Sequence, residues 1–187
     1  MTLSKLHNLR TKSVDFVQVY PQAKIKSEIY LRNPAGVVLD QEGGDAALKL
    51  LKTLYGLKDA GLTWFEHLSN GLNDTGVVST DSDPCVFVKG TYIIILYVDD
   101  CIILSRTKKE ADKVLAALDG RGYKMTDEGT TEECMGVLIT HGDDGSFRMS
   151  QPFLIDRIIA ATAGITDAQS ARTPAVAGTT LNKDSTG

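Results

Sequence analysis

The sequence places two adjacent carboxylates inside its most apolar stretch. Residues 92–104 read YIIILYVDDCIIL, so Asp99 and Asp100 stand between two runs of Ile, Leu, Val and Tyr. The runs predict two strands joined by a two-residue hairpin connection, in which Asp is a tolerated turn residue. An isolated Asp-Asp pair is explained as a turn former. Here the apolar strands predict a partly buried hairpin, where two carboxylates raise each other's pKa and a divalent cation would relieve their repulsion.

A third carboxylate can join this pair. Asp15 lies near the start of VDFVQVY at residues 14–20, whose β-branched and aromatic side chains predict a strand. Three carboxylates at one sheet edge suit a site that holds two Mg²⁺ or Mn²⁺ ions about 3.5–4 Å apart. Such a site carries out phosphoryl transfer, because it activates a 3′-hydroxyl and stabilises the leaving pyrophosphate.

The elements that must position these carboxylates alternate between strands and helices. The order β-α-β-β-α-β is that of the ferredoxin-like split fold, an α+β domain with an antiparallel sheet and both helices on one face. In that sheet the first strand lies beside the hairpin, so Asp15 can face Asp99 across the strand pair. The expected strands are 14–20, 92–98, 101–105 and 123–127, and the expected helices are 62–75 and 107–119.

Shorter elements follow or interrupt this core. Residues 46–54 fit either a short helix or a strand, and from residue 168 small polar residues with Pro and Gly indicate a linker or frayed tail. The remaining patterns predict strands at 28–31, 135–140 and 146–149, a turn and a short strand within SDPCVFVKG at 82–90, and a helix at 153–163.

Composition limits the class of protein. The net charge of −4 argues against a nucleic-acid binder, but residues 1–32 carry six basic and two acidic side chains. That segment could meet a phosphate backbone, and a solvated surface explains it equally well.

The longest apolar run is too short to span a bilayer and the N-terminus has no apolar signal core, so we expect no membrane partner and no secretion. Cys85, Cys101 and Cys134 form no zinc or disulfide pattern.

Several segments resemble one family. YVDD at 97–100 resembles the catalytic motif of reverse transcriptases. LKTLYGLKDAGLTWFEHL at 51–68 is similar to the LYGLKQAP..W segment of copia-type (Pseudoviridae-like) LTR retrotransposon polymerases, and residues 14–36 are similar to LDVKNAFLHGDLxEEVYMxQPPG of that family. Residues 83–90 and 135–159 match its later segments. The resemblance keeps the family's order over nearly the whole chain.

The resemblance implies an RNA-directed DNA polymerase domain that transfers nucleotides from dNTPs to a primer 3′-hydroxyl with two Mg²⁺ or Mn²⁺ ions. It implies a truncated polymerase, with a palm at residues 1–130 whose fingers are largely absent, a primer-grip hairpin and partial thumb at 131–165, and a linker or tail at 166–187. Its partners would be an RNA or DNA template-primer and the rest of a Pol polyprotein, including fingers, ribonuclease H and integrase. The resemblance implies that the protein is located in a cytoplasmic virus-like particle or in the nucleus.

The resemblance also implies the catalytic residues. Asp15 matches the first catalytic aspartate of the family, and Asp99 and Asp100 match the second and third. All three would ligate metal, assisted by the backbone carbonyl of Phe16.

Further roles follow for substrate binding. Tyr20 matches the aromatic under the incoming sugar, and Lys58 could meet the triphosphate. Tyr97 would lie near the primer terminus, and Met135 and Gly136 match the region that holds the primer end. Tyr20 and Tyr97 are also explained as core aromatics.

The sequence departs from the family at two positions. Asp59 replaces the Gln of YGLKQAP and Gly61 replaces its Pro, while Trp64 and Phe65 fit packing of a helix face and receive no chemical role. A carboxylate near a triphosphate should weaken binding. An inert retroelement remnant that only binds nucleic acid or other chains is therefore the alternative function. Another palm-type enzyme, such as a nucleotide cyclase, is disfavoured because no GxGxxG or GKS/T segment is present.

Overall fold

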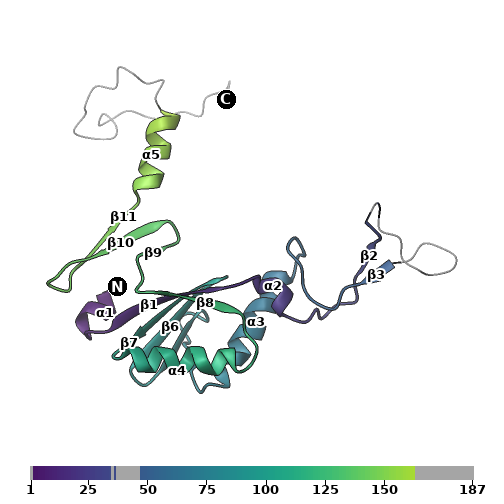
Figure 1. The fold of residues 1–187 in the computed structure, drawn as a ribbon, viewed down its shortest axis with the longest axis horizontal. Coiled ribbons are helices and arrows are strands. Elements are labelled where there is room, and N and C mark those ends of the chain that lie inside the picture. Colours follow the sequence, from purple (N-terminus) through teal and green to yellow (C-terminus); the bar gives the residue numbers. More distant parts are fainter. Residues whose placement is uncertain (1, 35, 37–46, 163–187) are drawn as a thin grey trace, which may run out of the picture. The chain divides into compact units, whose positions relative to one another are not determined.

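A six-stranded antiparallel sheet dominates the computed structural model, which describes residues 2–34, 36 and 47–162 (Figure 1). Its strand order is β4-β5-β6-β7-β1-β8, and every neighbouring pair is antiparallel. The fold is therefore mixed α and β, as expected. The strands are β1 (Arg10–Phe16), β4 (Val78–Ser79), β5 (Val86–Lys89), β6 (Tyr92–Tyr97), β7 (Asp100–Ser105) and β8 (Met125–Gly129).

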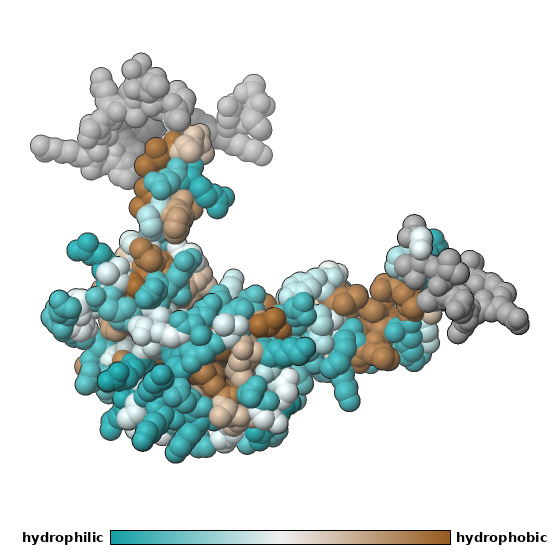
Figure 2. Space-filling view, in the orientation of Figure 1, coloured by the Kyte–Doolittle hydropathy of each residue, from teal (hydrophilic) through white to brown (hydrophobic). Residues whose placement is uncertain are grey.

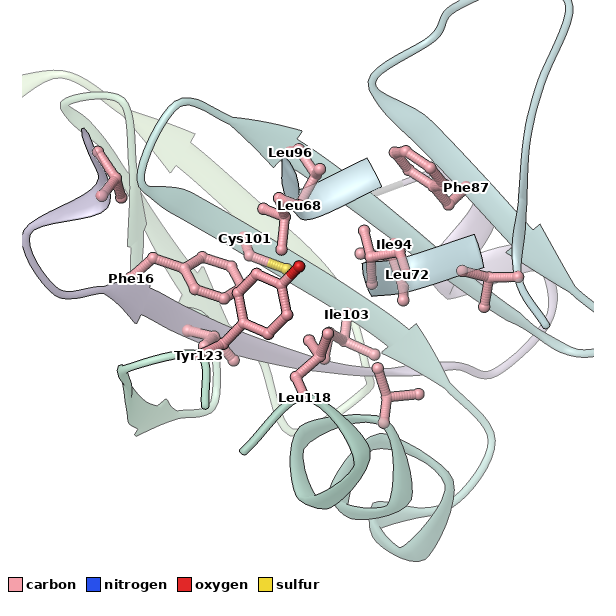
Figure 3. Packing of buried hydrophobic residues seen from close by; sticks show 14 of the residues in the cluster. Phe16, Leu68, Leu72, Phe87, Ile94, Leu96, Cys101, Ile103, Leu118 and Tyr123 are labelled. Carbon is pink, nitrogen blue, oxygen red and sulfur yellow. The ribbon is translucent and has the colours of Figure 1, made fainter. Parts of the chain in front are cut away.

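Two helices complete the main core. α3 (Ala60–Asn73) and α4 (Lys108–Asp119) confirm the predicted helices, and α4 has the predicted capping box between Thr107 and Glu110. Alternate residues of the central strands point toward these helices, as the pleat of a strand requires. Figure 3 shows part of this packing, with Leu68 and Leu72 of α3 and Leu118 of α4 against Ile94, Leu96 and Ile103 of the sheet. The buried cluster also includes Val14, Phe16, Trp64, Cys101, Ala111 and Val114.

Several strands differ from the expectation in their ends, among them β10 (Val137–His141), which begins at Val137 and not at residue 135; the largest differences are in β1 and β8. β1 ends at Phe16 because Gln18 adopts a left-handed conformation with φ of 50° and the chain then turns into the short helix α2 (Val19–Gln22). The strand expected at 123–127 runs from Met125 to Gly129. Tyr123 instead lies in the core, where its hydroxyl donates to the carbonyl of His67 at 2.7 Å.

A buried lysine joins three elements. Lys12 of β1 donates from Nζ to Asp112 of α4 at 2.7 Å and to Asp127 of β8 at 2.6 Å. Burial alone would lower the pKa of Lys12, but the hydrogen bonds to the two carboxylates raise it on balance. One of the six basic groups of the N-terminal segment is therefore already neutralised within the fold.

The other elements lie outside this sheet. They are α1 (Thr2–Leu6), the antiparallel pair β2 (Tyr30–Arg32) and β3 (Ala47–Lys49), the three-stranded sheet of β9 (Glu133–Cys134), β10 (Val137–His141) and β11 (Phe147–Ser150), and α5 (Pro152–Ala161). The ambiguous segment 46–54 thus contributes a strand; its residue 46 and the predicted tail from residue 168 lie outside the described residues.

The chain divides into two compact units, Met1–Ser150 and Gln151–Gly187. In the second unit, α5 has no buried residue in its described length, and hydrophobic residues form much of its surface (Figure 2). These exposed side chains are Phe153, Leu154, Ile155, Ile158 and Ile159. In the part of the chain that the structure describes, no helix combines the length and apolarity that crossing a membrane requires.

Candidate active site

The three predicted catalytic aspartates meet at one end of the β1–β7 pair. Asp15 lies directly opposite Asp100 in the antiparallel register. Their strand neighbours Val14, Phe16 and Cys101 point into the helix-covered core, so both carboxylates belong to the opposite face of the sheet. The sequence correctly placed the hairpin beside β1, but the residue that faces Asp15 is Asp100 and not Asp99.

The hairpin turn is shifted by one residue from the expectation. Tyr97 pairs with Asp100, so Val98 and Asp99 form the two-residue connection. Val98 has φ of 55°, a left-handed conformation that is a strained outlier for a β-branched residue. Asp100 is therefore the first residue of β7, and the strand fixes the direction of its side chain.

Two hydrogen bonds attach this turn to the core. The N–H of Phe16 donates to the carbonyl of Asp99 at 2.9 Å, while the Phe16 ring is buried. The indole Nε1 of Trp64 donates to the carbonyl of Val98 at 2.6 Å. Sequence reasoning missed this role for Trp64, because a helical apolar pattern shows that a side chain is buried but not which carbonyl its N–H reaches. The role of the Phe16 carbonyl as a metal ligand stays a prediction.

The environment of Asp100 disfavours its ionised form. Burial raises the pKa of Asp100, and the negative charges of Asp99 and Asp15 raise it further. Glu133 of β9 makes a fourth contribution, which the sequence gave no reason to expect. The neighbouring Cys134 also has a raised pKa, from burial and then from the charge of Asp100. The start of the β9–β10 hairpin thus lies within electrostatic range of the aspartates.

The donor set fits a hard divalent cation. Mg²⁺ prefers carboxylate oxygens, and a cation would relieve the repulsion that raises the pKa of Asp100. Among residues 2–34, 36 and 47–162, no three His, Cys, Asp or Glu side chains are grouped to hold an ion as they stand. The backbone brings the aspartates to one place, and binding of an ion requires their side chains to rotate toward one another.

The predicted nucleotide-binding residues lie on α2 and before α3. Tyr20 is part of α2 and not of a strand; it is partly buried, and its ring packs edge-to-face on Tyr55 with centroids 4.6 Å apart. Lys58 is exposed. Asp59, which replaces the family's Gln, occupies the N-cap position of α3, where the helix dipole favours an acidic side chain.

The predicted primer-binding residues are exposed. Tyr97 is 57% exposed at the end of β6, so its interpretation as a core aromatic is wrong. Met135 and Gly136 form the turn between β9 and β10, with φ of 50° and 74°. Positive φ at both central positions is typical of a tight hairpin turn, and it leaves the Met135 side chain 58% exposed.

Comparison with known proteins agrees with this arrangement of motifs. Residues 1–177 match the family described as Reverse transcriptase (RNA-dependent DNA polymerase). The Retrovirus-related Pol polyprotein from transposon TNT 1-94 of Nicotiana tabacum is 26% identical over 165 residues, which cover 85% of this chain and 12% of that protein. The Transposon Ty1-GR3 Gag-Pol polyprotein of Saccharomyces cerevisiae is 30% identical over 119 residues, or 63% of this chain and 7% of that protein. The chain therefore spans about a tenth of the length of these curated relatives.

Proposed function

Since this chain belongs to the reverse transcriptase (RNA-dependent DNA polymerase) family and its relatives are Ty1/copia-type Pol polyproteins, we propose that it forms the palm of an RNA-directed DNA polymerase. The observation that carries the proposal is the pairing of Asp15 with Asp100, next to Asp99. The strand order β6-β7-β1-β8, with α3 after β1 and α4 after β7, supports a ferredoxin-like palm.

The proposed reaction joins the primer 3′-oxygen to the α-phosphorus of a dNTP and breaks the bond between the α- and β-phosphates, which releases pyrophosphate. Asp15, Asp99, Asp100 and the carbonyl of Phe16 would hold two Mg²⁺ or Mn²⁺ ions. When bound, these ions supply Lewis-acid activation of the hydroxyl and neutralise charge on the leaving group. The β1–β7 pair keeps two of the carboxylates on one face of the sheet, where a primer end can approach them.

The chain's other residues would orient the substrates. Tyr20, held against Tyr55, would present its ring to the incoming sugar, and the exposed Lys58 would meet the triphosphate. Tyr97 extends from the same turn as the aspartates and would contact the primer terminus. Met135 and Gly136 would hold the primer end from the β9–β10 turn, whose first strand contributes charge near Asp100.

We propose the following division of labour within the chain. Residues 1–130 are the palm, residues 131–165 a primer-grip hairpin and partial thumb, and residues 166–187 a linker. The relatives are much longer polyproteins, which supports further domains in the intact element. Fingers, ribonuclease H and integrase are the segments we expect there, in a cytoplasmic virus-like particle or in the nucleus.

Primer extension on poly(rA)·oligo(dT) with Mg²⁺ or Mn²⁺ tests the proposal. We expect at most weak extension by this chain alone, and a further loss of at least about 100-fold in the Asp99→Asn/Asp100→Asn variant, because metal-assisted chemistry loses its ligands. The double variant Asp81→Asn/Asp119→Asn removes the same charge from exposed positions and should extend like the parent. Equal extension by the site variant would refute the assignment of the aspartates. No extension by the parent would favour the alternative function, an inert remnant that only binds nucleic acid or other chains.

A further inference from the structure

The turn that presents Asp99 and Asp100 is held in a conformation that its sequence disfavours. Val98 has φ of 55°, where a glycine would be unstrained and a β-branched side chain crowds the backbone. A residue keeps such a conformation only where its surroundings hold it. The contacts of Val98 therefore decide whether the turn stays in this shape.

Trp64 supplies the contact to this residue. Its indole Nε1 donates to the Val98 carbonyl at 2.6 Å, across 34 positions of the sequence. The ring itself is fixed, since Trp64 is 2% exposed and packs edge-on against Phe16, with centroids 5.5 Å apart. The next carbonyl along the turn, that of Asp99, accepts from the N–H of Phe16. Two successive carbonyls of the turn are thus bound by two residues that contact each other.

Packing alone does not hold the turn. A pocket of about 340 Å³ lies between the turn and α3, so side chains do not fill the space on this side of the turn. An apolar cavity of this size provides no directional contact that would select one backbone conformation. The residues that line it are Gly61, Trp64, Phe65, Leu68, Cys85, Leu96, Tyr97 and Val98.

We propose that Trp64 is a positioning residue for the catalytic turn: its indole N–H holds the Val98 carbonyl and thereby keeps Asp99 and Asp100 together beside Asp15. This inference rests on the proposed function for its consequence in catalysis, but not for the hydrogen bond itself. It gives the single tryptophan of the chain a chemical task that the helix pattern did not reveal.

Mn²⁺ binding measured by calorimetry tests the positioning role without relying on polymerase activity. Trp64→Phe keeps an aromatic ring and removes the donor, so we expect about 10-fold weaker Mn²⁺ binding. Leu68→Val changes another buried residue of the same helix and cavity without touching the turn carbonyls, and its affinity should stay within about two-fold of the parent. Similar weakening by both variants would overturn the proposal, because it would indicate general loosening of the core.

A second variant links the effect to the strain. Glycine adopts a positive φ without strain, so in the Val98→Gly background the turn does not need the hydrogen bond from Trp64. Trp64→Phe should therefore weaken Mn²⁺ binding by only about two-fold in that background. An undiminished loss in that background would contradict the proposed role.

The backbone amide resonances of residues 98–100 give a readout that needs no metal. They should shift in Trp64→Phe and stay unchanged in Leu68→Val. The single indole N–H of the parent should also exchange slowly with deuterium, because it is buried and bonded. Unshifted turn resonances or rapid indole exchange would overturn the proposal for Trp64, whereas a parent that binds no Mn²⁺ would count against the proposed function instead.

Discussion

The carboxylate of Asp100 lowers the stability of the folded domain when it is ionised. Burial raises its pKa, with further increases from the charges of Asp99 and Asp15. A raised pKa means that the folded chain binds the proton more tightly than the unfolded chain. The contribution of Asp100 to stability is therefore fully present while its carboxyl is protonated, and this contribution is lost as the pH rises through the folded-state pKa. At neutral pH without a cation, the ionised carboxylate destabilises the domain.

Asp100→Asn should therefore stabilise the protein at pH 7 without divalent cations, with a melting temperature about 2–4 °C above that of the parent. The difference should shrink as the pH is lowered through the raised pKa, because protonation then neutralises Asp100 in the parent too. Scanning calorimetry between pH 3.5 and 8 measures both effects. Asp81→Asn, at an exposed position, is the control and should change little. A gain that does not vary with pH would show that charge on Asp100 is not its cause.

At this scale the sequence indicated that Asp15 and the Asp99–Asp100 pair would come together, but it did not predict their register or their neighbours. The apolar runs beside YVDD do not alternate, so they leave the register of β6 against β7 open by one residue. In the structure Tyr97 pairs with Asp100, which fixes the register and places Val98 in the turn with a strained, left-handed backbone. Glu133 acts on Asp100 from 33 positions further along the chain, and Trp64 donates to Val98 from 34 positions before it. No local sequence pattern predicts contacts over such separations.

At the scale of elements, α3 contains two glycines with opposite surroundings. Gly71 faces the Tyr123 ring so closely that a methyl group there would overlap the ring and its hydroxyl. That hydroxyl donates to the carbonyl of His67, which keeps the ring in place. Gly61 lies in the first turn of the same helix, and a methyl group there would meet nothing within 4 Å. Glycine is required at one position and tolerated at the other.

Gly71→Ala should destabilise the domain by about 1–3 kcal/mol, because overpacking outweighs the higher helix propensity of alanine. Gly61→Ala gains the same propensity without the overlap and should stabilise by up to about 1 kcal/mol. Urea denaturation of the two variants beside the parent provides the comparison. A gain in stability at both positions would mean that the Tyr123 ring moves aside freely and that its hydrogen bond to His67 does not fix the position of the ring.

The helices and most strands were predictable because their signals are local. The apolar stripe of α3 and the capping box of α4 appear within single segments. The first strand was placed too late because VDFVQVY has strand-forming residues up to Tyr20, whereas the left-handed Gln18 ends β1 and α2 follows. The start of β1 was missed because Lys12 looks like a surface residue until Asp112 and Asp127 are brought to it from distant elements.

At the scale of the molecule, the basic N-terminal segment is less basic than its composition suggests. Lys12 is paired with two aspartates and Lys26 with Glu66. Lys24 and Lys52, in contrast, lie opposite each other in an antiparallel bridge, a placement that is unfavourable for like charges. No carboxylate of the described residues lies within ion-pair distance of either.

These two lysines line one groove with a volume of about 620 Å³, beside α3. Lys52 also lines an adjoining groove with Arg121 and Lys124. Burial and the charge of Lys52 both lower the pKa of His67, which lines both grooves, so His67 does not add a positive charge at neutral pH. Lysine and arginine are therefore the positively charged side chains of these grooves, on a chain whose net charge is −4.

We therefore expect the affinity for a primer–template to depend only moderately on salt, because few cations are free to contact phosphates. Each phosphate that a cation neutralises adds about 0.9 to the slope of log K against log salt for a duplex. If Lys24 and Lys52 are such cations, Lys24→Gln/Lys52→Gln should reduce the magnitude of the slope by about 1–2. Fluorescence anisotropy from 50 to 200 mM salt measures it. Lys109→Gln/Lys113→Gln removes the same charge from exposed positions of α4 and serves as the control. Equal reductions would indicate that only net charge matters, while a loss confined to the first variant would place the phosphate backbone beside α3.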